Sequence, residues 1–264
     1  MEVSSHPSLT FREIFAEFYG LLMYSFFEGF AILLAVNSLA NQFGISMMVT
    51  GIFTINYWMK RGVAACHFNP VITVAVLLEK KISITKAGIY MLAQILGSYV
   101  GALLLLFFVP TNFEEMADDS AGNAIVGCPH LNDDFSPIAG IIVELFGGLF
   151  LTVVYLFIFS SPQYSTYTPC VAAVYGMFKV SGGMVTGAAI DPFRYMGPAM
   201  VALKLSDFYV YLFPPFFGGV LGVFLYRFLL KSKKENDDED DAESKMDLVE
   251  NDEIEVEEEK IKRE

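Results

Sequence analysis

The chain has 264 residues, of which 54% are hydrophobic and 15% aromatic, and its formal net charge is -13. A soluble domain of this size does not normally need so much apolar surface, so the composition favours a bilayer as the solvent for most of the chain. Residues 231–264 hold most of the excess acid, and the three cysteines show no metal-type spacing. We therefore expect a membrane protein without a metal, a cofactor or a nucleic-acid partner.

Six apolar runs are long enough to cross a bilayer, which takes roughly 20 apolar residues in a helix. They predict spans at 12–37, 43–63, 87–109, 137–159, 167–183 and 206–230. Two further apolar runs, 69–79 and 192–203, are about half as long. Their length is typical of re-entrant segments, which enter and leave the bilayer on the same side.

Basic residues near the ends of these runs set the expected orientation, because loops rich in Lys and Arg stay in the cytoplasm. One side of the six-span arrangement collects Arg12, Lys60, Arg61, Lys80, Lys81, Lys86, Arg227, Lys231, Lys233 and Lys234. The link 110–136 has acidic but no basic residues and is expected outside. Residues 1–11 then form a cytoplasmic N-terminal segment and 231–264 an acidic cytoplasmic tail, too polar to fold alone. We expect the membrane to be the plasma membrane or an intracellular one such as the vacuolar membrane.

Two similar halves are visible, at about 12–109 and 137–230. The stretch around Glu17, A-E-F-Y-G, is echoed around Glu144 as V-E-L-F-G, and a short Pro-started run follows in each half. Because each half has three spans, the second must enter the membrane inverted relative to the first. A carboxylate inside an apolar span is expected to pair within the protein rather than face lipid.

The short runs begin at Asn69-Pro70 and Asp191-Pro192. Pro suits the first position of a helix, and Asn or Asp just before it can cap the open backbone N–H groups. Two such helix starts meeting near the midplane would point their positive dipole ends into one lumen and repel cations and protons.

The residues around these starts are H-F-N-P-V-I-T-V from His67 and G-A-A-I-D-P-F-R-Y-M-G-P-A from Gly187. In this repeated order they resemble the aquaporin, or major intrinsic protein, family over about residues 12–230. The resemblance implies an all-α channel domain with six transmembrane helices and two re-entrant half-helices in an inverted repeat. It also implies a homotetramer, with water and small neutral solutes as the permeant molecules.

Several site residues follow from the resemblance. Arg194 would narrow an outer constriction and oppose cations, and counting without gaps from the two boxes adds Val49, Lys179 and Ala188. A second cation beside Arg194 is costly unless it is paired or reaches outer water, so a shift of one turn to Tyr175 stays open. The half-helix motifs are Asn69, Pro70, Val71, Asp191, Pro192 and Phe193; Glu17, Glu144 and His67 would support the loops that precede them.

The second box departs from the family pattern. Asp191 stands where Asn is expected, and an ionised Asp accepts hydrogen bonds but does not donate them. It either caps the helix only or also weakens the barrier to cations. Val71 and Phe193 replace Ala, and their bulk points either into packing or into the lumen.

These patterns predict a passive channel for water that extends to glycerol or other small neutral solutes. Small Val49 and Ala188, with Leu212, favour glycerol-sized molecules, whereas Tyr195 and the short link 203–206 resemble water-selective members. The alternatives are a non-conducting or ion-leaky aquaporin-like protein, and a secondary transporter that uses Asp191, Glu17 and Glu144. An enzyme is not expected, because no nucleophile with a partnered base, phosphate loop or metal-ligand cluster is evident.

Overall fold

The computed structural model describes residues 9–36, 39–59, 67–108, 127–161, 164–203 and 205–230. The described residues up to Val223 form one compact unit, and those from Phe224 on belong to another. Several expectations lie outside the described residues: residues 1–8, the basic pair Lys60-Arg61, most of the link 110–136, and the acidic tail 231–264.

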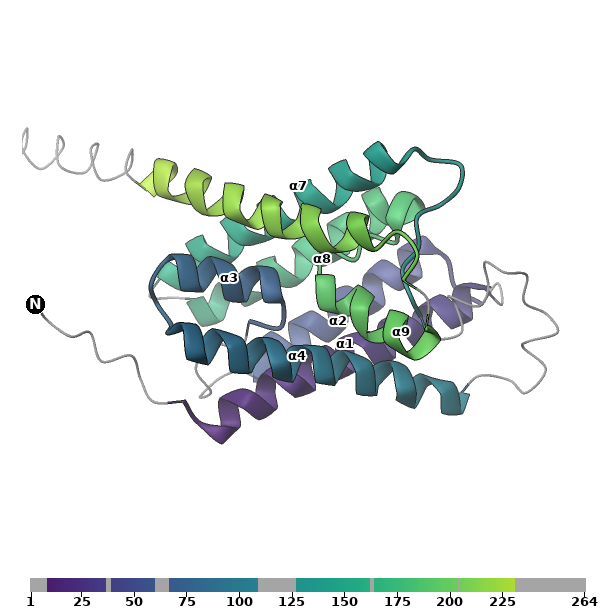
Figure 1. The fold of residues 1–264 in the computed structure, drawn as a ribbon, viewed down its shortest axis with the longest axis horizontal. Helices are drawn as coiled ribbons and strands as arrows, with labels where there is room; N and C mark the ends of the chain where they lie inside the picture. Colours follow the sequence, from purple (N-terminus) through teal and green to yellow (C-terminus); the bar gives the residue numbers. More distant parts are fainter. Residues whose placement is uncertain are drawn as a thin grey trace, which may run out of the picture. The chain divides into compact units, whose positions relative to one another are not determined.

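Helices account for all the regular structure in the described residues, with no strand among them (Figure 1). The long helices are α1 (Phe11–Val36), α2 (Gln42–Met59), α4 (Ile84–Leu105), α7 (Pro137–Ser160), α8 (Tyr164–Thr186) and the last described helix, Phe208–Leu230. The short ones are α3 (Pro70–Leu78) and α9 (Pro192–Ala202), with a single 3-10 turn, η1 (Leu106–Phe108), after α4. The prediction of six long and two short helices is confirmed within the ranges that the structure describes.

Among the described helices, four are long and apolar enough to cross a membrane by length and composition: α1, α4, α7 and Phe208–Leu230. The other two long helices, α2 and α8, carry more polar residues and pack against each other. One contact between them is the hydrogen bond from Ser46 Oγ to the Gly176 carbonyl, at 2.7 Å. Covering each other's polar faces lets both lie inside an apolar bundle, since polar groups in a membrane need partners within the protein.

Close helix packing repeats in the two halves and depends on small residues. In the first half, a Cβ at Gly97 of α4 would come within 2.1 Å of the Phe18 carbonyl oxygen of α1. In the second half, a Cβ at Gly218 would lie 2.0 Å from the Leu145 carbonyl oxygen of α7. Only glycine permits either approach, and small residues are the usual means of bringing membrane helices together.

The short helices lie inside the bundle of long ones. α3 packs against α4 and α7, α9 packs against α4 and α1, and the two short helices also contact each other. In Figure 1, α3 lies along one end of α4 and α9 along the other. The short helices therefore occupy corresponding places in two halves that run in opposite directions.

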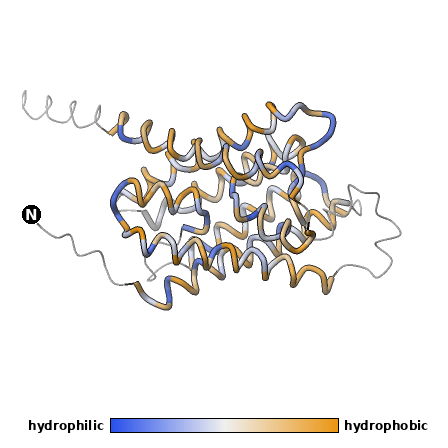
Figure 2. The backbone as a smooth tube through the Cα atoms, in the orientation of Figure 1, coloured by the Kyte–Doolittle hydropathy of each residue, from blue (hydrophilic) through white to orange (hydrophobic). Residues whose placement is uncertain are grey.

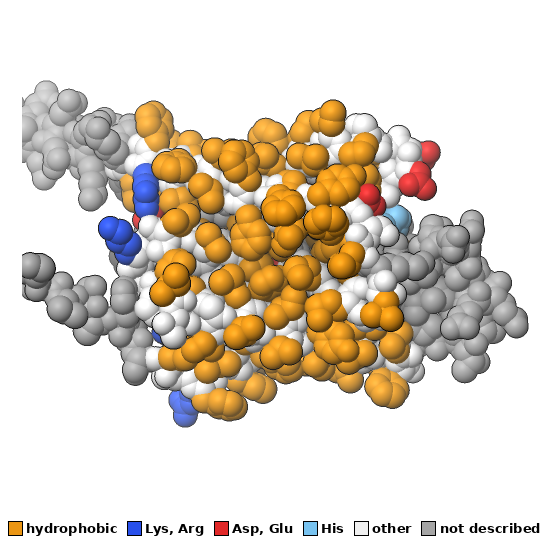
Figure 3. Space-filling view, viewed as in Figure 1, with side chains coloured by type: hydrophobic (Ala, Val, Ile, Leu, Met, Phe, Trp, Pro, Cys, Tyr) orange, Lys and Arg blue, Asp and Glu red, His pale blue; other side chains and the backbone are white. Residues whose placement is uncertain are grey.

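Large apolar side chains remain exposed on the long helices. Leu92 of α4, Phe146 of α7 and Phe217 are 64%, 56% and 59% exposed. Apolar side chains cover the broad middle of the face in Figure 3, and Figure 2 shows hydrophobic residues running along the helices. Burying such surface is favourable by roughly 25 cal/mol per Å². Exposed apolar surface of this extent is typical of a membrane or protein interface.

Candidate functional site

Two buried glutamates hold the segments that lead into the short helices. Glu17 accepts hydrogen bonds from the backbone N–H groups of the two residues before Asn69, at 2.5 and 2.8 Å. Glu144 accepts them from the two residues before Asp191, at 2.9 and 2.6 Å. The residue directly before Asn69 has φ 53°, and the one before Asp191 has φ 44°. The repeat seen in the sequence is thus a repeat of the same hydrogen-bonded turn.

The first short helix begins at Asn69, whose side chain is fully engaged. Its Oδ1 accepts from the Val71 N–H at 2.8 Å, which caps α3. Its Nδ2 donates to the Tyr175 hydroxyl at 2.8 Å and to the Ile190 carbonyl at 3.0 Å. Both amide protons of Asn69 are therefore occupied by the protein's own groups.

The second short helix begins at Asp191, which caps α9. Its Oδ1 accepts from the N–H groups of Phe193 and Arg194 at 2.9 and 3.1 Å. Its Oδ2 is buried and has no hydrogen-bond partner in the described part of the chain. Asp191 thus accepts from two N–H groups at the start of α9 and has a second carboxylate oxygen without a partner among the described residues.

The bulk of Val71 goes into packing between helices. Val71 is 1% exposed, and its Cγ1 would lie 2.3 Å from a Cβ at Gly219. Phe193 is half-buried at the start of α9. The missing side chain at position 219 is what makes room for the larger residue at position 71.

His67 lies in the wall around the first turn. Its Nδ1 is 3.1 Å from Thr73 Oγ1, and its ring stands edge-on to Tyr90 with the centroids 5.3 Å apart. Gln94 Nε2 donates to Glu17 Oε2 at 2.7 Å and to Thr73 Oγ1 at 3.0 Å. This network braces the loop that leads to Asn69. No metal-binding group of three or more His, Cys, Asp or Glu occurs among the described residues.

Three aromatic side chains fill the space beside Asn69, and we call Tyr24, Phe53 and Tyr175 the aromatic cluster. The rings of Phe53 and Tyr175 stack at 3.7 Å between centroids with an interplanar angle of 11°. Tyr24 meets Phe53 edge-on at 4.6 Å, and its hydroxyl donates to the Ala189 carbonyl at 3.3 Å. All three side chains are fully buried.

Glu28, Lys179 and Arg194 meet next to this cluster, and we call them the charged triad. Arg194 Nε donates to Glu28 Oε2 at 2.9 Å, and the Lys179 ammonium forms an ion pair with Glu28 Oε1. The Lys179 ammonium also donates to the Gly187 carbonyl at 2.6 Å, and Arg194 Nη2 donates to the Gly127 carbonyl at 2.7 Å. Arg194 Nη1 is buried without a hydrogen-bond partner in the described residues.

The structure brings Lys179 to Arg194 through Glu28, whereas Tyr175, one turn away, contacts Asn69. Lys179 and Arg194 thus share one carboxylate, and the assignment of Lys179 to the constriction stays a prediction. Val49 and Ala188 are also buried, at 1% and 0% exposure.

Sequence reasoning missed Glu28. The sequence predicted buried carboxylates at Glu17, Glu144 and Asp191. Glu13 and Glu28 are also buried, at 4% and 2% exposure. A signal was available: Glu28 follows Glu17 by eleven residues, close to three helical turns, so both carboxylates lie on one face of α1.

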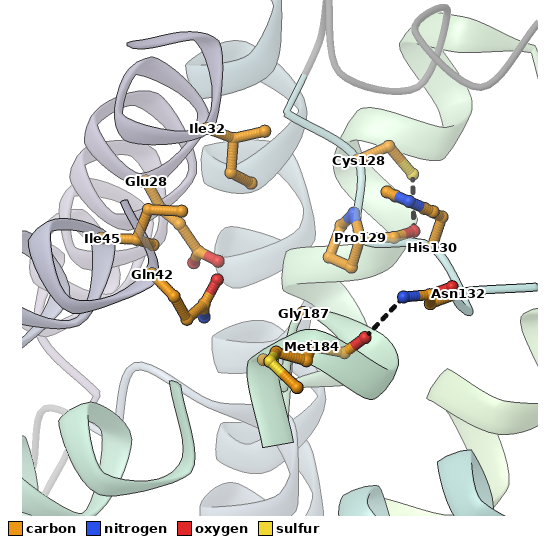
Figure 4. Close-up of a pocket in the computed structure, with 11 residues that line it drawn as sticks. Glu28, Ile32, Gln42, Ile45, Cys128, Pro129, His130, Asn132, Met184 and Gly187 are labelled. Carbon is orange, nitrogen blue, oxygen red and sulfur yellow. Dashed lines mark hydrogen bonds between the residues drawn. The ribbon is translucent and has the colours of Figure 1, made fainter. Parts of the chain in front are cut away.

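A pocket of about 250 Å³ opens beside the charged triad. It is lined by residues from α1, α2, α8 and the segment before α7, among them Glu28, Gln42, Pro129, His130 and Met184. Figure 4 shows the side chains of Glu28 and Gln42 turned towards this space. Gln42 also donates to the Lys179 carbonyl. Glu28 thus joins the pocket to the two buried cations.

A bundle of six long helices, with two short capped helices that meet inside it in an inverted repeat, defines a helical membrane channel fold. Residues 3–226 match the family model described as major intrinsic protein. The chain belongs to that family.

Named relatives agree with this assignment. Human aquaporin-2 is 31% identical over 230 residues, which cover 83% of this chain and 79% of that protein. Aquaporin A of Dictyostelium discoideum is 24% identical over 87% of this chain and 82% of its own length. Among solved structures, the aquaglyceroporin from Plasmodium falciparum superposes with a TM-score of 0.68 at 18% identity, covering 81% of this chain and 94% of its own. This last likeness shows the shared fold.

Proposed function

We propose that the protein is a passive transmembrane channel for water that also admits small neutral solutes such as glycerol. The observation that carries the proposal is the pair of short helices, each capped by an Asx residue, each held by a buried glutamate, and in contact with each other. Membership of the major intrinsic protein family and the names of the aquaporin relatives support it. Channels in this family are not enzymes, and we propose no catalytic role.

The groups left free in the interior suit a neutral hydroxylic molecule. Arg194 Nη1 offers a donor and Asp191 Oδ2 an acceptor, both without a partner in the described residues. Water and small alcohols donate and accept at once, so they can use both groups. The cationic Arg194 and the positive ends of the two short helices oppose the entry of cations and protons.

The charged triad supports water as the main permeant molecule. Small Val49 and Ala188 by themselves would leave an open constriction, but the other two proposed constriction residues, Lys179 and Arg194, are long and both pair with Glu28. These long side chains occupy width that a polyol would need. We therefore expect water to pass faster than glycerol.

The remaining features of the protein follow the family. We propose a channel domain over residues 12–230, a cytoplasmic N-terminal segment 1–11 and an acidic cytoplasmic tail 231–264. The protein would be a homotetramer in the plasma membrane or an intracellular membrane such as that of a vacuole, with lipid around the exposed apolar side chains.

Osmotic flux in reconstituted vesicles tests the proposal. Proteoliposomes of the full chain are mixed rapidly with an impermeant osmolyte and, separately, with glycerol, and light scattering records their shrinking and reswelling. We expect water efflux faster than in protein-free vesicles, with a slower glycerol phase. Rates equal to those of empty vesicles in both arms would contradict a channel, and flux that requires an ion gradient would indicate a coupled transporter.

A further inference from the structure

The charged triad has a composition that a constriction built on one arginine does not need. It contains two cations, Lys179 and Arg194, and one carboxylate, Glu28, which contacts both. All three side chains are buried, with exposures of at most 2%. Two buried like charges repel strongly in a medium of low dielectric, so the bridging carboxylate is what makes their proximity tolerable.

The cations are anchored independently of Glu28. The Gly187 carbonyl accepts from the Lys179 ammonium at 2.6 Å, and the Gly127 carbonyl accepts from Arg194 Nη2 at 2.7 Å. Neither contact involves Glu28, so replacing its carboxylate with an amide of the same shape removes neither acceptor. Loss of the Glu28 charge would therefore leave two uncompensated cations at the same place.

We propose that Glu28 is a specificity-determining residue, which sets the outer constriction to a single net positive charge by offsetting the charge of Lys179. This inference rests on the proposed channel function. One net positive charge opposes cations and protons. Two net positive charges would attract anions into the path, and a net charge of zero would lower the barrier to cations. Asp191, which caps α9 next to Arg194, is unchanged in every comparison below and does not alter their order.

Three variants vary this charge in steps. Glu28→Gln leaves two positive charges, Lys179→Met leaves none, and the double variant Glu28→Gln/Lys179→Met restores one. In proteoliposomes, a chloride-sensitive dye reports anion entry, a pH-sensitive dye reports proton leak under a potassium diffusion potential, and light scattering reports water flux. We expect roughly tenfold faster chloride entry in Glu28→Gln and roughly tenfold faster proton leak in Lys179→Met. A tenfold change in rate corresponds to about 1.4 kcal/mol, and one unit charge at low dielectric changes the energy of a passing ion by at least that amount.

The double variant is the decisive measurement. Charge balance predicts that it excludes both ions as tightly as the natural chain, although it carries two substitutions. Ion leaks in the double variant that equal the sum of the two single variants would overturn the proposal, because they would mean general damage to packing. Chloride entry in Glu28→Gln at the natural rate would overturn it as well.

Glu13→Gln is the matched control. Glu13 is also a buried carboxylate of α1, paired with Lys86 at 2.8 Å, and it receives the same substitution away from the triad. It should leave both ion readouts as in the natural chain. If Glu28→Gln does not reach the membrane, Lys179→Met alone decides: a proton leak supports the proposal and an ion-tight vesicle overturns it. Absent water flux in the natural chain would instead count against the channel function itself.

Discussion

The two short helices start with the same kind of cap, but their capping side chains differ in the hydrogen bonds that they can make. In the first, the amide of Asn69 donates to Tyr175 and to the Ile190 carbonyl, so its donors are spent within the protein. In the second, Asp191 accepts the two cap bonds through Oδ1, and its buried Oδ2 has no partner in the described residues. The shared cap gives both short helices the same start, while the two side chains differ in hydrogen-bonding capacity: the amide of Asn69 ties α3 to two other segments, and Asp191 has one acceptor oxygen left without a partner in the described residues.

Removing the carboxylates that hold the two starts should have the largest effect. Glu17→Ala and Glu144→Ala each leave two buried backbone N–H groups without acceptors, so we expect losses of about 3–5 kcal/mol in unfolding free energy. Thermal unfolding in detergent measures both. Similar losses support two equivalent halves, and a mild effect at only one glutamate would break that equivalence.

Asn69→Asp places a carboxylate at the start of α3, as Asp191 does at the start of α9, and should cause the next largest loss of stability. The carboxylate can still cap α3, but it loses the donated bonds to Tyr175 and Ile190 and faces the Ile190 carbonyl with negative charge. We expect about 2–3 kcal/mol lower stability and reduced insertion into the membrane. Expression level and thermal unfolding provide the measurements, and a natural melting profile would show that the two starts are interchangeable.

Tyr175 tests whether the engaged donor of Asn69 limits flux. Tyr175→Phe keeps the stack on Phe53 but frees one amide proton of Asn69, and Tyr175→Ala also removes the ring. We expect water permeability to rise severalfold in Tyr175→Ala and by less in Tyr175→Phe. The comparison of the two variants in stopped-flow light scattering separates the hydrogen bond from the ring. Unchanged permeability in both would mean that the aromatic cluster does not limit flux.

Asp191→Asn should have the smallest effect. An amide oxygen can accept from the Phe193 and Arg194 N–H groups as the carboxylate does, so the cap and the water flux should stay within about twofold of the natural chain. The removed negative charge should lower any cation leak. Side-by-side ion and water flux measurements decide this, and a large fall in water flux would show that the free carboxylate oxygen takes part in permeation.

Local patterns in the sequence determined the architecture of this protein. Apolar run length separated six long helices from two short ones, Pro after Asn69 and Asp191 marked where the short helices begin, and the echo of Glu17 in Glu144 indicated the inverted halves. These features depend on residues close together in the chain or on their repetition, so they are legible without a structure.

Only the tertiary structure decided how side chains meet across helices. It packed Val71 against Gly219, and it joined Lys179 to Arg194 through Glu28 while Tyr175 bonds to Asn69. It also made Glu28 the common partner of two cations that lie 151 and 166 residues further along the chain. Contacts at such separations depend on the relative rotation and register of packed helices, which no local periodicity encodes, so the charged triad became visible only when the helices were assembled.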